Sequence, residues 1–397
     1  MIIGIDASRA FIPDRTGTEN YSYHLIKEML RLPESKIHTF VLFIRPKTSV
    51  ESELDGYTNV IVKVVPWRYL WTQLGLAWAT WKVQTLPECG SPSLRECREL
   101  DVLWVPAHTL PIFRNPHIKT VVTIHGLEYQ WLPEYKNLLQ RWYLPLSTIY
   151  AARSADQLIA VSHFTAKQLE KELHTNRKKI KVVYEGTEFS SNPVIQYSSG
   201  TLRKYGLQDK KYILFVGTIQ PRKNLAALIA AFARLGTDLA DYRLVIAGSV
   251  GWLASEVFAA VQKHQVQDRV VFTGRVSQIE LESLYMGAKL YVQPSITEGF
   301  GLPVLEAMKY GVPVIGSDGG ALGEVIGKAG IIVSITNQKF SNSQIESGFV
   351  DRLAKEMEKV LREPKLRTKM AVAGKLRVGE LTWSKAAKET LKVLLNV

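Results

Sequence analysis

Short apolar runs recur along the whole chain and are separated by segments with helical spacing. In the first half these runs are IIGID (2–6), FVLFI (40–44), VIVKVV (60–65), VLWV (102–105), VVTI (121–124), LIAV (158–161) and KVVY (181–184). In the second half they are YILFVG (212–217), LVIAG (244–248), VVFTG (270–274), LYVQ (290–293), VPVIG (312–316) and GIIV (330–333). Such runs are typical of parallel strands that are buried on both faces.

Helical segments lie between several of these strands. They cover 20–32, 138–152 and 163–173 in the first half, and 225–235 and 278–288 in the second. Ser162 precedes the third of them and suits the N-cap position. Alternation of strand and helix favours a doubly wound α/β domain in each half. The sequence therefore predicts two Rossmann-like domains in tandem.

The polar stretch FSSNPVIQYSSG, residues 189–200, indicates the linker between the two domains. We therefore expect the first domain over 1–188 and the second over 201–376. The last part of the chain, 377–397, is predicted to contain a final helix over 383–395, with apolar positions at Ala387, Leu391 and Leu394. An amphipathic helix of this kind needs a surface to cover.

Length and composition agree with two globular cores, since the chain has 397 residues of which 46% are hydrophobic. The chain starts directly with a predicted strand and contains no apolar run of about 20 residues, so we expect a cytoplasmic protein without a spanning helix. Cys89 and Cys97 occur in a polar stretch and are expected to be free thiols in a loop.

The formal net charge of +13 suggests an anionic partner, such as a diphosphate or an acidic lipid surface. The excess of Lys and Arg is spread over both halves and forms no basic arm, so nucleic acid is not expected as a partner.

The sharpest cluster of candidate ligand-binding residues follows the strand 290–293. Doubly wound sheets bind ligands beyond the carboxyl ends of their strands. The cluster comprises Glu298, Gly299, Phe300, Gly301, Leu302 and Glu306. Glycines let the backbone approach a ligand, and Pro303 suits the first turn of a helix whose free amides would face an anion such as a diphosphate.

The two glutamates invite comparison with the acid and nucleophile of a glycosidase, which stand about 5 to 9.5 Å apart. Eight positions of a helix span about 12 Å, so Glu298 and Glu306 fit two contacts on separate parts of one long ligand better. One carboxylate would hold a ribose diol and the other a hexose. The alternative is that Glu298 caps the helix and Glu306 faces solvent.

Four other candidate residues lie after predicted strands. Arg222 and Lys223, in VGTIQPRKN, are adjacent cations that can neutralise a diphosphate, unless they merely form a solvated turn. His125 closes the strand 121–124 and can hydrogen-bond a sugar hydroxyl or carry a proton, although an isolated histidine is more often packed. Gly17 can bring backbone amides to a phosphate or an acceptor, or simply form a turn.

Together these residues resemble the large retaining family numbered four among glycosyltransferases, which has the GT-B fold of two facing Rossmann-like domains. The resemblance rests on the glycine loop near Gly17, VVTIH, LIAVSHFT, KVVYEG, VGTIQPRKN, LVIAGS, VVFTGRVS, EGFGLPVLEAM and a final helix that starts with Trp. It implies that this last helix returns to the first domain.

The resemblance also implies roles for the residues. Glu306 would bind the donor ribose, Glu298 and the amides of Gly299 to Gly301 the donor sugar, and Lys223 the diphosphate. His125 would contact the sugar near the reacting carbon, while Gly274 and Arg275 would border the base. Substitution would occur on the front face, with the diphosphate taking the acceptor proton. Neither a metal nor a cofactor is implied, only a GDP- or UDP-linked sugar donor.

Three departures from the family pattern concern single residues. Thr218 stands where many members have an arginine, and Arg222 is the candidate to supply the missing charge. Gly126 stands where an aspartate often follows the histidine, and Glu185 where asparagine is common.

The stretch PWRYLWTQLGLAWATWKVQ, 66–84, places Trp67, Leu70, Trp71, Leu74, Trp78 and Trp81 on one predicted helical face. We expect this face to pack against the first domain. The alternative is peripheral contact with the inner face of the membrane, because tryptophans and cations suit a membrane interface.

The sequence thus predicts a hexosyltransferase of the mannose or glucose type, acting on a glycan or a lipid-linked glycan. The alternatives are a nucleotide-sugar epimerase on the same fold and a non-catalytic sugar-nucleotide-binding partner. The sequence does not choose the nucleotide, the sugar, the acceptor, the linkage or the oligomeric state.

Overall fold

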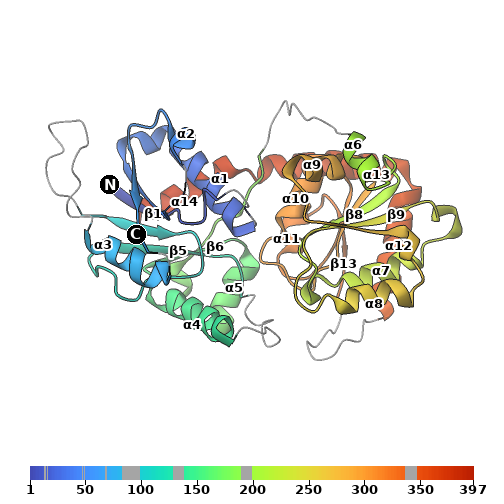
Figure 1. Ribbon diagram of the computed structural model, residues 1–397, viewed down its shortest axis with the longest axis horizontal. Helices are drawn as coiled ribbons and strands as arrows, with labels where there is room; N and C mark the ends of the chain where they lie inside the picture. Colours follow the sequence, from blue (N-terminus) through green and yellow to red (C-terminus); the bar gives the residue numbers. More distant parts are fainter. Residues whose placement is uncertain are drawn as a thin grey trace. The chain divides into compact units, whose positions relative to one another are not determined.

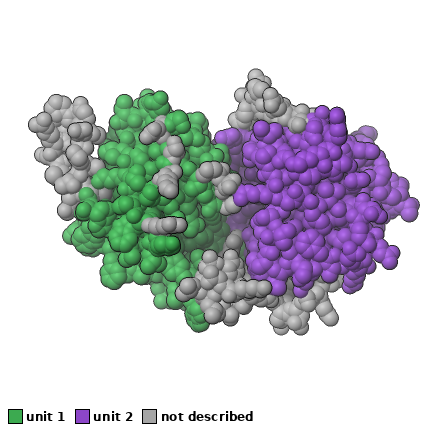
Figure 2. Space-filling model, in the orientation of Figure 1, with its two compact units in different colours: residues 1–185, 383–397 green, residues 186–382 purple. Residues whose placement is uncertain are grey.

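The computed structural model describes residues 1–12, 15, 17–46, 48, 50–67, 69–82, 99–127, 138–188, 199–335 and 347–397. Cys89, Cys97 and residues 189–198 of the expected linker lie outside the described residues. The chain divides into two compact units (Figure 2). Unit 1 comprises Met1–Glu185 and Trp383–Val397, and unit 2 comprises Gly186–Thr382.

Unit 1 is built on a seven-stranded sheet in the order β3-β2-β1-β4-β5-β6-β7 (Figure 1). All neighbouring strands are parallel. The strands are β1 (Ile2–Asp6), β2 (Thr39–Ile44), β3 (Val60–Val64), β4 (Val102–Val105), β5 (Lys119–Ile124), β6 (Gln157–Ala160) and β7 (Ile180–Val182). Each strand predicted in the first half is confirmed.

Unit 2 repeats this arrangement with six parallel strands in the order β10-β9-β8-β11-β12-β13. They are β8 (Tyr212–Val216), β9 (Arg243–Ala247), β10 (Val270–Gly274), β11 (Leu290–Gln293), β12 (Val314–Ser317) and β13 (Ile331–Val333). The predicted strands of the second half are confirmed as well, and both sheets are doubly wound.

The longer helices of unit 1 are α1 (Gly17–Arg31), α4 (Leu138–Ser154), α5 (His163–Glu172) and α14 (Trp383–Leu395). The Ser162 side chain accepts a hydrogen bond from the Thr165 amide and caps α5, as predicted. Helix α14 packs on α1, where the Trp383 ring stacks on His24 with 5.5 Å between centroids. Its apolar positions Ala387, Leu391 and Leu394 are buried, so the last helix belongs to the first unit.

Unit 2 contains α6 (Ser199–Lys204), α7 (Leu225–Ala233), α8 (Ser255–Lys263), α9 (Gln278–Gly287), α10 (Leu302–Lys309), α11 (Leu322–Ile326), α12 (Ser347–Arg362) and α13 (Pro364–Glu380). Phe215 of β8, Phe232 of α7 and Phe349 of α12 are fully buried in one core. Each such side chain contributes about 1.5–3 kcal/mol through burial, which anchors the strand ends that carry the site.

The aromatic stretch does not pack as expected. It forms a π-helix over Trp71–Leu76 and then α3 (Ala77–Lys82). Trp71 is buried, but Leu74, Trp78 and Trp81 are exposed. The wider π turn changes the angular spacing of side chains, so residues placed for an ordinary helical period no longer share one inward face.

Candidate active site

The sheet of unit 2 reverses its strand order between β8 and β11, and this switch point places two loops side by side. From β8 the chain continues to β9 and β10 on one side, whereas β11, β12 and β13 lie on the other. Arg222 and Lys223 lie in the 3-10 turn Pro221–Lys223 after β8, and Glu298 lies in the turn after β11. Ligands of doubly wound sheets bind at such a point.

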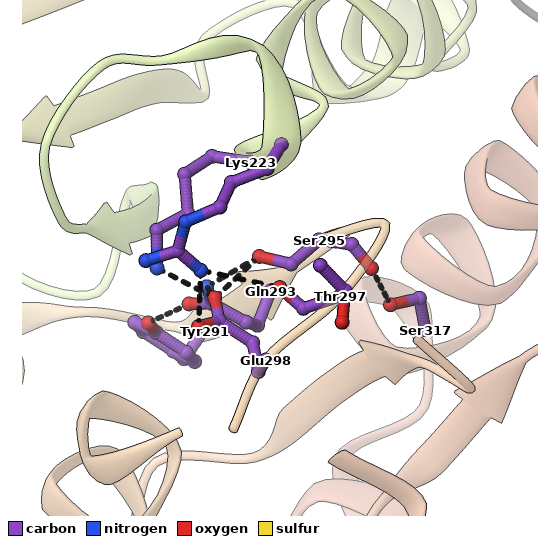
Figure 3. Close-up of polar contacts among 8 residues, drawn as sticks. Lys223, Tyr291, Gln293, Ser295, Thr297, Glu298 and Ser317 are labelled. Atoms are coloured by element: carbon purple, nitrogen blue, oxygen red, sulfur yellow. Dashed lines mark hydrogen bonds and ion pairs between the residues drawn. The ribbon is translucent and has the colours of Figure 1, made fainter. Parts of the chain in front are cut away.

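Four side chains converge on the carboxylate of Glu298 (Figure 3). Lys223 Nζ donates to Glu298 Oε1 at 2.6 Å, and Arg222 Nη1 donates to Oε2 at 2.8 Å. Gln293 Nε2 and Ser295 Oγ also donate to Oε1, at 2.8 and 2.7 Å. Glu298 is only 6% exposed and Lys223 only 7%, so the interaction joins charges that are nearly removed from water.

The electrostatics keep Glu298 ionised. Burial alone would raise the pKa of its carboxyl group, but Lys223 and Arg222 outweigh burial and hold that pKa well below its usual range. Two cations and one carboxylate leave the cluster with one positive charge in excess. A buried cluster of this sign is suited to receive an anion.

The backbone around Glu298 is fixed by the neighbouring loops. The Ile296 amide donates to Arg222 O at 2.8 Å, and the Ala321 amide donates to Glu298 O at 2.9 Å. Gly320 has φ +72°, and a Cβ there would lie 2.3 Å from Glu298 O. Glycine is therefore required at this position, because it allows the loop after β12 to close on the loop after β11.

A series of buried hydrogen bonds leads from Tyr291 to the carboxylate of Glu298. Tyr291 donates to Gln293 Oε1, and Gln293 Nε2 donates to Ser295 Oγ at 2.8 Å. Gln293 and Ser295 have no exposed surface. Neither Gln293 nor Ser295 was predicted from the sequence to belong to the site. The available signal was a glutamine at the end of the otherwise apolar strand LYVQ, where a buried amide needs partners.

The glycine-rich turn leads into α10 as predicted. Gly301 has φ +104°, and a Cβ there would lie 2.7 Å from Leu322 Cδ2. No side chain caps the start of α10, where Pro303 stands in the first turn. Phe300 is buried beside this start, and Leu302 is half-buried. A helix start with this geometry can accept an anion.

Glu306 lies on α10 and neither caps a helix nor stands alone in solvent. Tyr285 donates to Glu306 Oε2 at 2.8 Å, and the Tyr310 ring stacks on Tyr285 with 5.8 Å between centroids. Burial and the charge of Glu306 raise the pKa of Tyr285, so the tyrosine stays a donor. The partly exposed Glu306 keeps acceptor capacity for a ligand.

The remaining candidates of unit 2 lie near strand ends but outside this hydrogen-bonded cluster. Thr218 is exposed and lies two positions after the end of β8. Gly274 ends β10 with φ +66° and open space around it, and Arg275 is exposed. Strand β9 separates β10 from β8, so Gly274 and Arg275 border another part of the same sheet edge.

His125 follows β5 in unit 1 and is held by two oxygen atoms. Its Nδ1 lies 2.9 Å from Glu185 Oε1, and its Nε2 lies 2.9 Å from Pro106 O. Because a carbonyl only accepts, Nε2 carries a hydrogen, and the Glu185 contact requires a second proton on Nδ1 or on the carboxyl group. Burial of the neighbouring His108, together with electrostatic interactions with His125 and Arg9, lowers its pKa to about 3.

Gly17 begins α1 in unit 1, and a Cβ there would meet no atom within 4 Å. His125 and Gly17 thus belong to unit 1, and the other candidates belong to unit 2. Across the described residues, no group of three or more His, Cys, Asp or Glu side chains is arranged to hold a metal ion.

Comparison with known proteins identifies the family. Residues 201–377 match the model of the glycosyl transferases group 1, and residues 15–190 match the model of glycosyltransferase family 4. The chain belongs to the family-four glycosyltransferases.

Curated relatives of this glycosyltransferase include O-antigen mannosyltransferases. It is 28% identical over 287 residues to O-antigen chain mannosyltransferase B of Escherichia coli, which covers 71% of this chain and 72% of the relative. It is 28% identical over 240 residues to an O-antigen chain mannosyltransferase of Salmonella typhimurium, which covers 60% of this chain and 62% of the relative.

Solved structures confirm the predicted GT-B fold. Sucrose-phosphate synthase from Thermosynechococcus elongatus superposes with a TM-score of 0.71 at 19% identity, covering 100% of this chain and 98% of that chain. The Anabaena protein HepE in complex with UDP-glucose superposes with a TM-score of 0.69 at 14% identity, covering 100% and 99%. At these identities the likeness concerns the fold.

Proposed function

We propose that this glycosyltransferase moves a hexose from a nucleotide-diphosphate sugar to a hydroxyl group of a glycan or a lipid-linked glycan, with retention of the anomeric configuration. The observation that carries the proposal is the buried cluster of Arg222, Lys223 and Glu298 at the switch point of unit 2. Mannose is the first candidate sugar, because two curated relatives are O-antigen mannosyltransferases.

Donor binding begins with an exchange of partners at this cluster. The donor diphosphate is an anion that competes with Glu298 for Lys223 and Arg222. Thr218 and the amides from Gly299 to Leu302 border the same anion. When the cations turn to the diphosphate, the Glu298 carboxylate becomes available to accept hydrogen bonds from hydroxyls of the donor sugar.

The nucleotide occupies the other side of the diphosphate. Glu306 accepts hydrogen bonds from the ribose diol, while Tyr285 holds its second oxygen. Gly274 and Arg275 border the base. The Anabaena structure that shares this fold contains UDP-glucose, which supports a nucleotide-sugar donor for the fold but leaves the choice between GDP and UDP to experiment.

In the transfer step the acceptor oxygen forms a bond to the anomeric carbon as the bond to the diphosphate oxygen breaks. Both occur on one face, which retains the configuration, and the acceptor proton moves to the departing diphosphate. Lys223 and Arg222 stabilise the negative charge that develops there. His125 of unit 1 is a further candidate, because its Nε2–H can donate to a hydroxyl oxygen in place of the Pro106 carbonyl.

We place this activity in the cytoplasm, as expected from the sequence. Across the described residues, no helix is both long and apolar enough to cross a membrane.

A donor panel tests the proposed function. GDP-mannose, UDP-glucose and UDP-GlcNAc are compared by thermal shift, and the product formed on an acceptor glycan is analysed by NMR for its anomeric configuration. We expect GDP-mannose to stabilise the protein most, and the new linkage to keep the configuration of the donor. Absence of stabilisation by all three donors, an inverted product, or a new sugar isomer formed from the donor alone would contradict the proposal.

A further inference from the structure

Unit 1 exposes a group of large apolar side chains, which we call the aromatic surface. It consists of Leu74, Trp78, Trp81, Phe113, Trp142 and Leu146. Phe113 is 78% exposed and Trp142 is 68% exposed. Single exposed apolar residues are ordinary, but a gathering of aromatic residues on one protein surface marks an interaction site.

Hydrogen bonds link the three segments that carry this surface, which are the π-helix with α3, the 110–114 loop and α4. Gln73 Nε2 donates to Leu110 O at 3.2 Å and to Tyr143 Oη at 3.4 Å, which links the π-helix to the 110–114 loop and to α4. Trp81 Nε1 donates to Phe113 O at 3.2 Å and links α3 to the same loop. In Figure 1, α3 and α4 accordingly lie on one side of the sheet of unit 1.

The charge of these segments has one sign. The described residues of these three segments, 71–82, 110–114 and 142–154, contain Lys82, Arg114 and Arg153 and no Asp or Glu. Lys82 Nζ lies 4.3 Å from the centre of the Trp78 ring, so a cation stands directly beside the exposed aromatic rings. Amphipathic aromatic rings next to cations suit the boundary between the headgroups and the acyl chains of an anionic bilayer.

We propose that the aromatic surface binds the surface of an anionic lipid bilayer. The rings of Trp78, Phe113 and Trp142 enter the headgroup region, and the ammonium group of Lys82 beside Trp78 faces anionic headgroups. The uniform positive charge favours a lipid surface over a protein partner, because protein surfaces usually mix both signs of charge. The proposal does not depend on the proposed donor chemistry of unit 2.

Co-sedimentation with vesicles tests this proposal on the full chain at physiological salt. One vesicle set contains phosphatidylcholine with phosphatidylglycerol, and the other contains phosphatidylcholine alone. The test variant is Trp78→Ser, Phe113→Ser and Trp142→Ser combined. The matched control is Val372→Ser with Leu376→Ser, which removes two exposed apolar side chains from α13 of unit 2.

We expect the wild type and the control to bind the anionic vesicles, and the test variant to lose about tenfold or more in partitioning, because binding scales with buried apolar area plus charge attraction. Circular dichroism and the donor-induced thermal shift should be unchanged in the variant, which separates this test from that of the transferase. Quenching of tryptophan fluorescence by brominated lipids should decrease in Trp142→Phe.

Two results would overturn the proposal. The first is a wild type that does not bind anionic vesicles. The second is a test variant that binds as well as the wild type, since adhesion would then come from the diffuse charge of +13 and not from the aromatic surface.

Discussion

Lys223 Nζ lies 2.6 Å from Glu298 Oε1, and this ion pair of opposite charges is buried. Arg222 holds the second oxygen of the same carboxylate. Removing one member of a buried ion pair leaves an uncompensated buried charge. Each of the three side chains therefore needs a partner of opposite charge in the folded protein. It also means that a bound diphosphate has to replace Glu298 as the partner of the two cations.

Replacing Glu298 should separate diphosphate affinity from turnover. In Glu298→Gln the two cations lose their competing carboxylate, so we expect a nucleoside diphosphate to bind at least as tightly as in the wild type. Turnover with the sugar donor should fall by about 100-fold, because a group that stabilises the reacting sugar is lost. Isothermal titration and initial rates measure both quantities, with the exposed Glu256→Gln as control. Weaker diphosphate binding together with unchanged turnover would contradict this assignment.

The same carboxylate predicts a pH dependence of stability. The pKa of Glu298 in the folded protein is lowered from its ordinary value of 4.5, because Lys223 and Arg222 outweigh burial. A lowered folded pKa contributes stability above the unfolded pKa, and that contribution is lost as pH falls towards the folded pKa. The difference in free energy of unfolding between wild type and Glu298→Gln should therefore shrink below about pH 4.5. Urea denaturation from pH 7 to pH 3 measures it, and a pH-independent difference would refute the prediction.

Gln293 is predicted to position Glu298 without touching the substrate. Gln293→Met keeps the volume of the side chain but removes the hydrogen bond to Glu298 Oε1. Hydrogen bonds to charged groups contribute about 1.5–3 kcal/mol, so we expect kcat to fall about tenfold. The KM for the donor should change little, because Lys223 and Arg222 still hold the diphosphate. The exposed Gln278→Met is the control, and a loss confined to KM would argue against positioning.

His125 and Glu185 should share an additional proton, because both ring nitrogens face oxygen atoms. Nitrogen-15 NMR at neutral pH is expected to show hydrogen on Nε2 and on, or shared with, Nδ1. In Glu185→Gln the amide can donate to Nδ1, so the ring should become the neutral Nε2–H tautomer. Identical spectra for wild type and variant would rule this interpretation out.

Much of the fold could be predicted because parallel strands that are buried on both faces consist of nearly continuous apolar residues, which are recognisable in the sequence. All thirteen predicted strands formed, and Trp383–Leu395 formed the predicted last helix. The prediction that the aromatic stretch 66–84 packs one helical face against the first domain was wrong. It assumed an ordinary helical period, whereas the backbone adopts a π-helix at Trp71–Leu76. Sequence patterning does not reveal that local choice.

The site could be predicted only in part. Position after a strand was enough to single out Lys223, Arg222 and Glu298, which the structure brings into one cluster. Their direct pairing, and the support from Gln293 and Ser295, depends on how loops from β8, β11 and β12 close on one another. Contacts between loops that are about 75 positions apart leave no periodic signal in a single sequence.

The central claim is that the cluster of unit 2 binds the diphosphate of the donor. Isothermal titration of Lys223→Met with GDP and UDP tests it most directly, with the exposed Lys263→Met of α8 as the matched control. Loss of a charge-assisted hydrogen bond should weaken the nucleotide that binds the wild type by about 10- to 100-fold, while the control keeps wild-type affinity. An unchanged Kd in a folded Lys223→Met protein would contradict the account.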